Sequence, residues 1–213
     1  MDWKDLFGSD DDNDSCIDNG ITTFEDIPGL CLIRKALGHE AQMSMTHEII
    51  QRGYFTGDNN QAMCFGELPA YLSQISNLVL HTYPSLFDTQ ILNREPLFDQ
   101  AILNLYKKGQ GICSHVDLLR FEDGILILSL LSSCVMTMKR ASDNVTKRIL
   151  LCPGDILSLS RDARFLWEHG IEEQLSDQID DQTIERGTRI SVTLRKLKNP
   201  GTIETMATSS NRY

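Results

Sequence analysis

The sequence predicts a mainly β domain with flanking helices, an α+β fold built on a sandwich or barrel of antiparallel strands. Two observations lead to this prediction. Apolar residues recur at helical spacing in two stretches before residue 82, and from about Pro96 onward the chain changes to short β-rich runs separated by Gly, Pro, Asp and Asn. Many short strands with regular turns are typical of sandwiches and barrels.

The two helices are expected at residues 38–51 and 68–81. The second has a stripe of apolar residues that we expect in the core, because they share one helix face: Leu68, Tyr71, Leu72, Ile75, Leu78 and Val79. The strands are expected at residues 101–106, 124–131, 135–140, 148–151, 156–160 and 189–196.

These elements fit one domain over residues 22–198. Residues 1–21 include the run Asp10-Asp11-Asp12-Asn13-Asp14, which cannot bury apolar surface, so we expect an acidic, disordered tail. Residues 199–213 are polar and include Pro200-Gly201 near their start. This composition predicts a second, flexible tail.

The formal net charge is −10, and its distribution matters more than its sum. Residues 1–20 carry seven Asp and one Lys, a net of −6, and residues 172–185 carry six acids and no base, another −6. The remainder is −10 + 6 + 6 = +2, so the rest of the surface can be basic locally. Net charge therefore does not select the partner.

Cysteines and apolar runs indicate the cellular setting. The six cysteines form no CxxC pair, which favours free thiols in a reducing compartment over a zinc ribbon or a disulfide framework. The first residues do not resemble a signal peptide, and the longest apolar run, near Ile125 to Leu131, is too short to cross a bilayer. We expect no membrane association, and a location in the nucleus, the cytoplasm or both.

Candidate metal ligands are His115, Asp117 and His169. His115 and Asp117 stand two positions apart, so extended backbone places both side chains on one side, although such a triplet is also common as a surface pair. His169 follows the turn Cys152-Pro153-Gly154-Asp155, and a lone histidine is often structural. Two histidines and one carboxylate on a β scaffold would supply a facial triad with open iron positions, whereas structural zinc prefers a closed set with thiolates.

The last expected strand alternates strictly. Arg189, Ser191, Thr193 and Arg195 share one face, and apolar residues occupy the other. This polar face could be solvated, or it could point into the barrel, where guanidinium groups bind the carboxylates of a small diacid. Asn104 and Tyr106 likewise share a face and offer an amide and a phenol to the same diacid, although either can belong to ordinary turn chemistry.

The order of these motifs resembles the AlkB branch of the 2-oxoglutarate and iron(II) oxygenases. The matching series runs from Phe98 to Lys196: Asn-x-Tyr, Gly-x-Gly-Ile from Gly109, His-x-Asp, Ser129-Leu130, Pro-Gly-Asp, His-Gly-Ile and Arg-x-Ser-x-Thr-x-Arg. The resemblance implies a double-stranded β-helix (jelly-roll) core at residues 96–198. Residues 22–95 resemble the family's N-terminal extension, with the substrate lid at Gln61 to Pro69.

The resemblance also implies roles for the candidate residues. His115, Asp117 and His169 would bind Fe(II), and Arg189 and Tyr106 would hold the distal carboxylate of 2-oxoglutarate. Arg195 and Asn104 would stabilise its metal-chelating end. Ser191 stands where the family often has Asn, so its shorter side chain can lose a contact.

The implied activity is a dioxygenase that couples decarboxylation of 2-oxoglutarate to succinate, in the presence of O2, with hydroxylation or oxidative demethylation of a macromolecule. Gln61 to Gly66 contains no Lys or Arg to grip phosphate, and the acidic segments would attract a basic protein such as a histone, which favours a protein substrate. Nucleic acid (alkylated DNA, RNA or tRNA) is the alternative, and a non-catalytic binding module on the same fold is a third. We expect a monomer.

Overall fold

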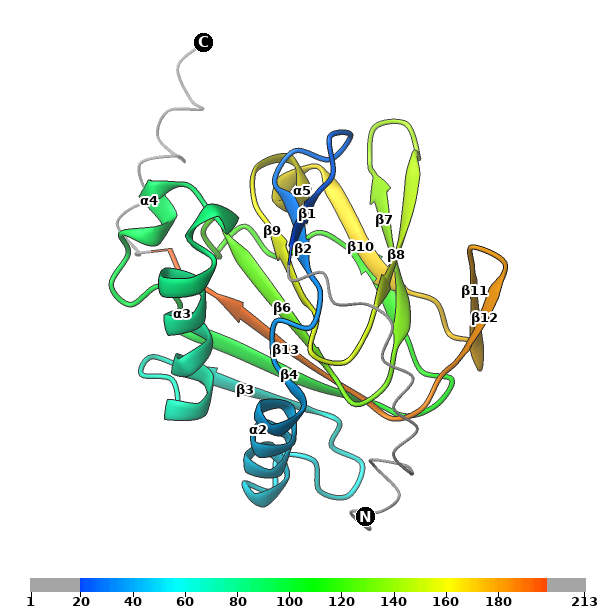
Figure 1. Ribbon diagram of the computed structural model, residues 1–213, viewed down its shortest axis with the longest axis horizontal. Helices are drawn as coiled ribbons and strands as arrows, with labels where there is room; N and C mark the ends of the chain where they lie inside the picture. The colour runs from blue at the N-terminus through cyan, green and yellow to red at the C-terminus, as the bar shows by residue number, and fades with distance from the viewer. Residues whose placement is uncertain (1–19, 199–213) are drawn as a thin grey trace.

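Two antiparallel sheets face each other and form the body of the protein (Figure 1). The computed structural model describes residues 20–198; of the two predicted tails, only Gly20 and Ile21 lie inside the described residues. The fold class and jelly-roll core predicted from the sequence are confirmed.

The major sheet has seven strands in the order β1-β2-β9-β6-β13-β4-β3. Their bounds are β1 Ile21–Thr23, β2 Leu30–Ile33, β3 Gln61–Phe65, β4 Gln100–Tyr106, β6 Ile125–Leu130, β9 Ile156–Leu159 and β13 Arg189–Arg195.

The minor sheet has four strands in the order β5-β10-β7-β8. They are β5 Ile112–His115, β7 Cys134–Arg140, β8 Thr146–Leu151 and β10 Trp167–Ile171, and a separate hairpin is formed by β11 Ser176–Ile179 and β12 Gln182–Glu185. The order brings β5 and β10, which are more than 50 positions apart in the sequence, into direct pairing.

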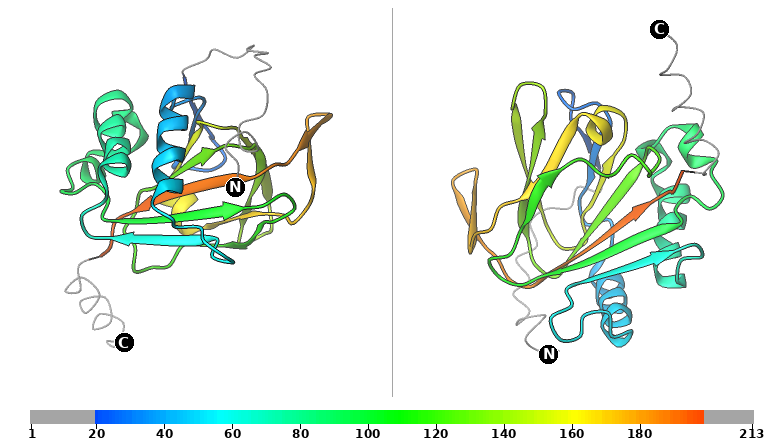
Figure 2. Two further views of the ribbon diagram at one scale, coloured as in Figure 1. Left: turned by 90° about the horizontal axis from the view of Figure 1, so that it is seen from below. Right: turned by 180° about the vertical axis from the view of Figure 1, so that it is seen from behind.

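Helices α2 (His39–Gln51) and α3 (Ala70–Thr82) lie on the same face of the major sheet, as Figure 2 shows. Leu72, Ile75 and Val79 of α3 are at most 1% exposed, as the helical spacing predicted. Burial of each such side chain contributes roughly 1.5–3 kcal/mol to stability. The remaining helical segments are short: η1 Pro84–Leu86, α4 Thr89–Leu92 and α5 Arg161–Phe165.

Strand β13 shows why the core has two halves. Ile190, Val192 and Leu194 pack with α2 and α3 in one apolar cluster. The polar residues of the same strand point to the other face, into the space between the sheets, where a second apolar cluster surrounds them. The alternation predicted from the sequence therefore separates a helix-covered core from an interior site.

The acidic stretch at residues 172–185, which the sequence suggested would attract a basic partner, is not uniformly exposed: five of its six acids are exposed and Asp177 is buried. It contains the β11–β12 hairpin, and Asp177 is fully buried, with two bonds of 2.6 and 2.7 Å from the Arg186 guanidinium. Burial alone would raise the pKa of Asp177, but these bonds and the backbone N–H of Val135 lower it overall. Part of the acidic charge is thus neutralised internally and is not available to attract a basic partner.

Among residues 20–198, the helices are all too short or too polar to span a bilayer.

Candidate metal centre and co-substrate pocket

His115, Asp117 and His169 come together at one end of the space between the sheets. Their ligand atoms all lie within 4.8 Å of one another. Because β5 and β10 are antiparallel neighbours, His115 and His169 are directly opposed, with ring centroids 4.5 Å apart. Asp117 follows β5 by two residues, and its Oδ2 lies 3.6 Å from Nε2 of His169. Two imidazoles and one carboxylate in this arrangement match the donor set of non-haem Fe(II) oxygenases.

Both imidazoles are prepared for metal binding. Nδ1 of His115 donates to the carbonyl oxygen of Cys113 at 2.9 Å, which leaves Nε2 free to act as a ligand. Burial lowers the pKa of His169 to about 4, so its ring is neutral at physiological pH and offers a lone pair.

Two glycines permit the close approach of β5 and β10. A Cβ at Gly170 would lie 2.9 Å from the Cα of Ser114, and one at Gly111 would lie 2.1 Å from the carbonyl oxygen of Ile171. Backbone atoms cannot yield as a flexible side chain can. The Gly-x-Gly-Ile and His-Gly-Ile motifs therefore set the strand spacing that brings the two histidines together.

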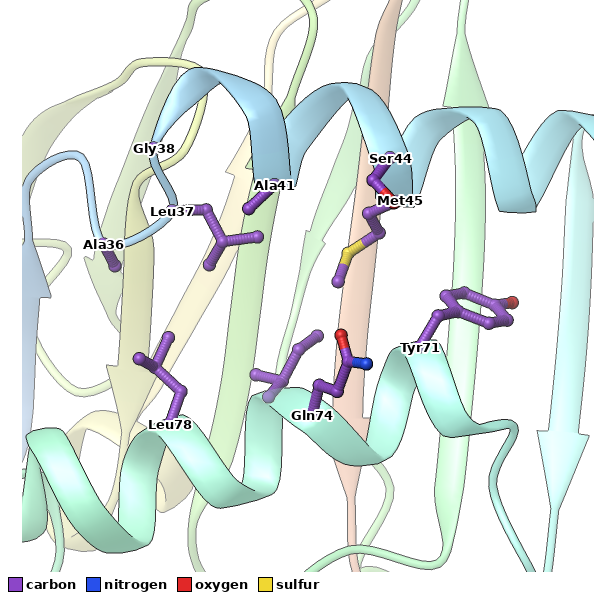
Figure 3. Close-up of a pocket in the computed structure, with 10 residues that line it drawn as sticks. Ala36, Leu37, Gly38, Ala41, Ser44, Met45, Tyr71, Gln74 and Leu78 are labelled. Carbon is purple, nitrogen blue, oxygen red and sulfur yellow. The ribbon is translucent and has the colours of Figure 1, made fainter.

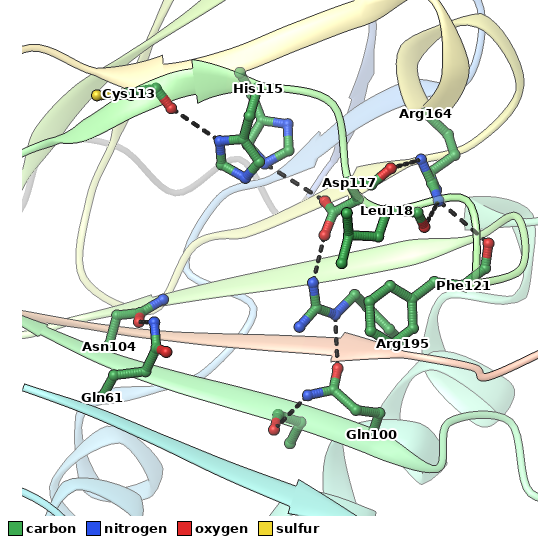
Figure 4. A network of polar contacts seen from close by, with 12 residues as sticks. Gln61, Gln100, Asn104, Cys113, His115, Asp117, Leu118, Phe121, Arg164 and Arg195 are labelled. Atoms are coloured by element: carbon green, nitrogen blue, oxygen red, sulfur yellow. Dashed lines mark hydrogen bonds and ion pairs between the residues drawn. The ribbon is translucent and has the colours of Figure 1, made fainter.

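Asp117 is held by two buried arginines (Figure 4). Nη1 of Arg195 forms an ion pair with Oδ1 of Asp117, while its Nε donates to Oε1 of Gln100 at 2.6 Å. Nη1 of Arg164 donates to the backbone carbonyl of Asp117 at 3.0 Å. The carboxylate thus has one oxygen fixed by Arg195 and the other directed toward His169.

Arg164 also fixes the rest of the loop after Asp117. Its Nη2 donates to the carbonyl oxygens of Leu118 at 2.9 Å and Phe121 at 3.2 Å, and the side chain is 2% exposed. The ring of Phe121 in turn lies 4.0 Å from the guanidinium carbon of Arg195. Arg195 therefore holds the carboxylate of Asp117, Arg164 holds its backbone, and Phe121 packs against Arg195.

We expect Arg164→Lys to lower the affinity for Fe(II) by about 10- to 100-fold, the usual effect of losing an outer partner of a metal ligand. Lysine keeps the charge, but its single ammonium nitrogen cannot take the places of both Nη1 and Nη2, which reach different carbonyl groups of the loop. Iron titration followed by calorimetry measures the change, and thermal unfolding checks that the fold persists. Arg161→Lys, at an exposed position on the same short helix, is the matched control; equal affinities in both variants would contradict the positioning role.

A pocket extends from the three candidate ligands along the inner face of β13 and β4. Its lining mixes polar and apolar side chains, and it contains every site residue that the sequence suggested: Asn104, Tyr106, His115, Asp117, His169, Arg189, Ser191 and Arg195. Ile112, Ile127, Met136 and Ile171 supply apolar wall.

Arg189 has unused hydrogen-bonding capacity in this pocket. The residue is 3% exposed, and its Nε donates to Oγ of Ser129 at 2.9 Å. Nη1 and Nη2 are buried without a partner. Its guanidinium carbon lies 5.4 Å from the ring centre of Tyr106, whose hydroxyl has a pKa raised by burial. A buried guanidinium without partners is costly, so the pocket fits an anionic ligand such as a carboxylate.

Two of the other predicted co-substrate residues, Arg195 and Asn104, have hydrogen-bonded partners within the protein. Arg195 contacts Asp117 and Gln100, and Oδ1 of Asn104 accepts a bond of 2.7 Å from Nε2 of Gln61. Ser191 is buried opposite Asn104 and Ser129 in the strand register. The predicted roles of Arg195 and Asn104 at the chelating end of 2-oxoglutarate stay predictions, and Arg195 supports a metal ligand as well.

Sequence reasoning missed Arg164, Gln100 and Phe121. Arg164 lies in a short helix and belongs to no recognised motif. Its partners are backbone carbonyl groups more than 40 positions away, and no side-chain pattern marks such contacts.

The fold and this donor set define a non-haem iron oxygenase site. The chain matches the model of the 2OG-Fe(II) oxygenase superfamily over residues 32–195, and it belongs to that superfamily. Its relatives place it in the AlkB type, so the predicted enzyme class, a dioxygenase that uses Fe(II), 2-oxoglutarate and O2, is confirmed.

Three relatives illustrate this placement. The alkylated DNA repair protein ALKBH8 homolog of Arabidopsis thaliana is 33% identical over 153 residues, 63% of this chain and 43% of that protein. The tRNA (carboxymethyluridine(34)-5-O)-methyltransferase alkbh8 of Xenopus tropicalis is 32% identical over 178 residues, 75% of this chain and 27% of that protein. The uncharacterized protein L905 of Acanthamoeba polyphaga mimivirus is 33% identical over 133 residues, 62% of this chain and 59% of that protein.

The chain spans less than two thirds of the length of each of these relatives. Among solved structures, OsALKBH1 has the same fold, with a TM-score of 0.59 and 16% identity, covering 79% of this chain and 98% of that one.

Proposed function

We propose that this protein is an oxygenase that oxidises an alkyl group on a base of a nucleic acid. The observation that carries the catalytic part is the buried guanidinium of Arg189, which has two unpartnered nitrogens in the same pocket as His115, Asp117 and His169. An anion site beside a facial triad is what a metal-bound diacid requires.

The proposal assigns a role to five polar residues of the pocket and to its apolar wall. His115, Asp117 and His169 hold Fe(II), and Arg189, oriented by Ser129, binds the distal carboxylate of 2-oxoglutarate together with Tyr106. When bound, Fe(II), 2-oxoglutarate and O2 supply the oxidising chemistry, with succinate and carbon dioxide as co-products. The apolar wall excludes water from the reacting centre. A hydroxylated N-alkyl carbon breaks down to an aldehyde and the free amine, so the net reaction is demethylation.

The choice of nucleic acid rests on two observations. First, relatives of this chain are named for alkylated DNA and for tRNA, whereas none of those given above is named for a histone. This favours the alternative substrate class over the basic protein that the acidic charge suggested. Second, exposed apolar side chains flank the pocket, one of them aromatic, and a base that stacks on an aromatic ring gains roughly 1–3 kcal/mol.

The stacking surface consists of Met63 and Phe65 on β3, 48% and 52% exposed. They are paired with Ile102 and Gln100 of β4, so they share the sheet face on which Ile102 lines the pocket. This is the segment in which the sequence suggested a lid; it is an edge strand of the major sheet. Because residues 61–69 contain no Lys or Arg, binding here would depend on stacking more than on phosphate contacts.

The test is succinate release from 2-oxoglutarate by the iron-loaded protein. We expect methylated oligonucleotides or tRNA to stimulate release and formaldehyde to accumulate, and a basic protein such as a histone to have no effect. Phe65→Ala should raise the KM for the oligonucleotide about tenfold, as expected for one lost stacking contact. Val145→Ala, an exposed apolar residue in the β7–β8 turn, is the control. Stimulation by the basic protein alone would overturn the substrate assignment and leave the oxygenase assignment intact.

A further inference from the structure

A second cavity lies between α2 and α3, on the face of the major sheet opposite the metal site (Figure 3). It has a volume of about 250 Å³. Its floor is apolar and includes Met45 and Ile75, while Ala41, Ser44 and Gln74 form exposed walls. The figure shows side chains of both helices directed into the gap. No residue of the oxygenase site lines this groove, so its apolar floor has no role in the proposed reaction.

Strand β1 starts close to this groove. Ile21 pairs with Ile33, and Ile33 is followed three positions later by Ala36, the first groove residue. Three residues span at most about 11 Å, and paired strands place their Cα atoms about 5 Å apart. The start of β1 is therefore within about 16 Å of the groove.

Residues 1–7, Met-Asp-Trp-Lys-Asp-Leu-Phe, have the chemistry that such a groove recognises. Trp3, Leu6 and Phe7 stand at positions i, i+3 and i+4, the spacing by which an amphipathic helix presents anchors to a groove. Residues 8–19 contain no aromatic residue and are rich in Asp. As an extended chain these twelve residues reach about 40 Å, more than the separation requires.

We propose that residues 3–7 of the chain dock into the α2–α3 groove of the same molecule, with Trp3 as the main anchor. An aromatic side chain buries a large apolar area at little entropic cost. The short connection gives a high effective concentration, so even a weak contact is populated.

The test uses the fluorescence of the full chain, which has two tryptophans. Trp167 is 2% exposed and contributes a constant, protected signal. The spectrum of Trp3 is therefore the difference between the wild type and Trp3→Phe. We expect this difference to be blue-shifted and weakly quenched by acrylamide. Ser44→Glu, which places a charge in the groove wall, should shift it to the solvent-exposed position and restore quenching.

Gln51→Glu adds the same charge at an exposed position of α2 that does not line the groove, and it should leave the Trp3 signal protected. Solvent-exposed emission of Trp3 in the wild type would overturn the proposal. Protection that Ser44→Glu does not change, or that disappears on dilution, would also overturn it, because Trp3 would then be bound elsewhere or by a second molecule. The readout does not depend on catalysis, so it is independent of the proposed function.

Discussion

His115→Ala should abolish stoichiometric Fe(II) binding and 2-oxoglutarate turnover while the protein stays folded. Removing one of three protein ligands from a facial triad leaves an incomplete coordination sphere, and a half-buried histidine can be truncated without leaving a charge inside. Nδ1 of His115 donates to the carbonyl oxygen of Cys113, and water can replace this bond because Cys113 is exposed. Calorimetric iron titration and succinate release measure the two losses.

The choice of ligand matters for the interpretation. Asp117→Ala would remove the same coordination, but it would also leave Arg195 buried without its ion-pair partner, at a cost of about 3–5 kcal/mol in stability. A loss of activity in that variant would not separate catalysis from folding. His81→Ala, at the exposed end of α3, is the control for a histidine outside the site. Normal iron stoichiometry in His115→Ala would refute the assigned centre.

The sequence predicted the core of the fold well because periodicity reports burial directly. All six expected strands and both expected helices occur within two residues of their predicted bounds. The strict alternation of β13 also predicted which side chains face the site, since its apolar members pack under the helices. Local patterns were sufficient wherever one face of an element is apolar and the other polar.

Other strands had no such pattern. In β2 all four residues are buried, and β10 contains Glu168 and His169 beside Trp167, so neither alternates clearly. Whether these two segments form strands depends on the strands that pair with them. Strand pairing also determines the metal site, because the register of β5 and β10 places His115 opposite His169. In the sequence, the only sign of this pairing is two glycine motifs that lie far apart.

Charge was the weakest guide to substrate. The six acids at residues 172–185 suggested a surface that attracts a basic partner. Five of them are exposed, but Asp177 is buried with Arg186, and Glu185 is 3.0 Å from Nζ of Lys108. A residue count cannot distinguish a carboxylate that holds the structure together from one that attracts a partner. The exposed Met63 and Phe65 are informative only once β3 is placed beside the pocket.

Arg189→Met should raise the requirement for 2-oxoglutarate at least 100-fold while increasing the stability of the ligand-free protein. Loss of a bidentate bond to a carboxylate removes about 3 kcal/mol, since hydrogen bonds to charged groups contribute roughly 1.5–3 kcal/mol each. In the ligand-free protein, however, Nη1 and Nη2 are buried without partners. Replacing such a buried charge by an apolar side chain of similar volume is often neutral or stabilising by about 1–4 kcal/mol.

Urea unfolding with and without 2-oxoglutarate measures both effects. In the wild type, ligand at a hundred times its Kd should add about 2.7 kcal/mol to the free energy of unfolding, and Arg189→Met should show no increase at that concentration. Arg148→Met, at an exposed position on β8, should retain the full ligand effect. If the ligand-free Arg189→Met protein were less stable than the wild type and still gained stability from 2-oxoglutarate, Arg189 would be a structural residue. Weaker 2-oxoglutarate binding together with higher stability of the ligand-free protein would show that Arg189 serves ligand binding and lowers the stability of the fold.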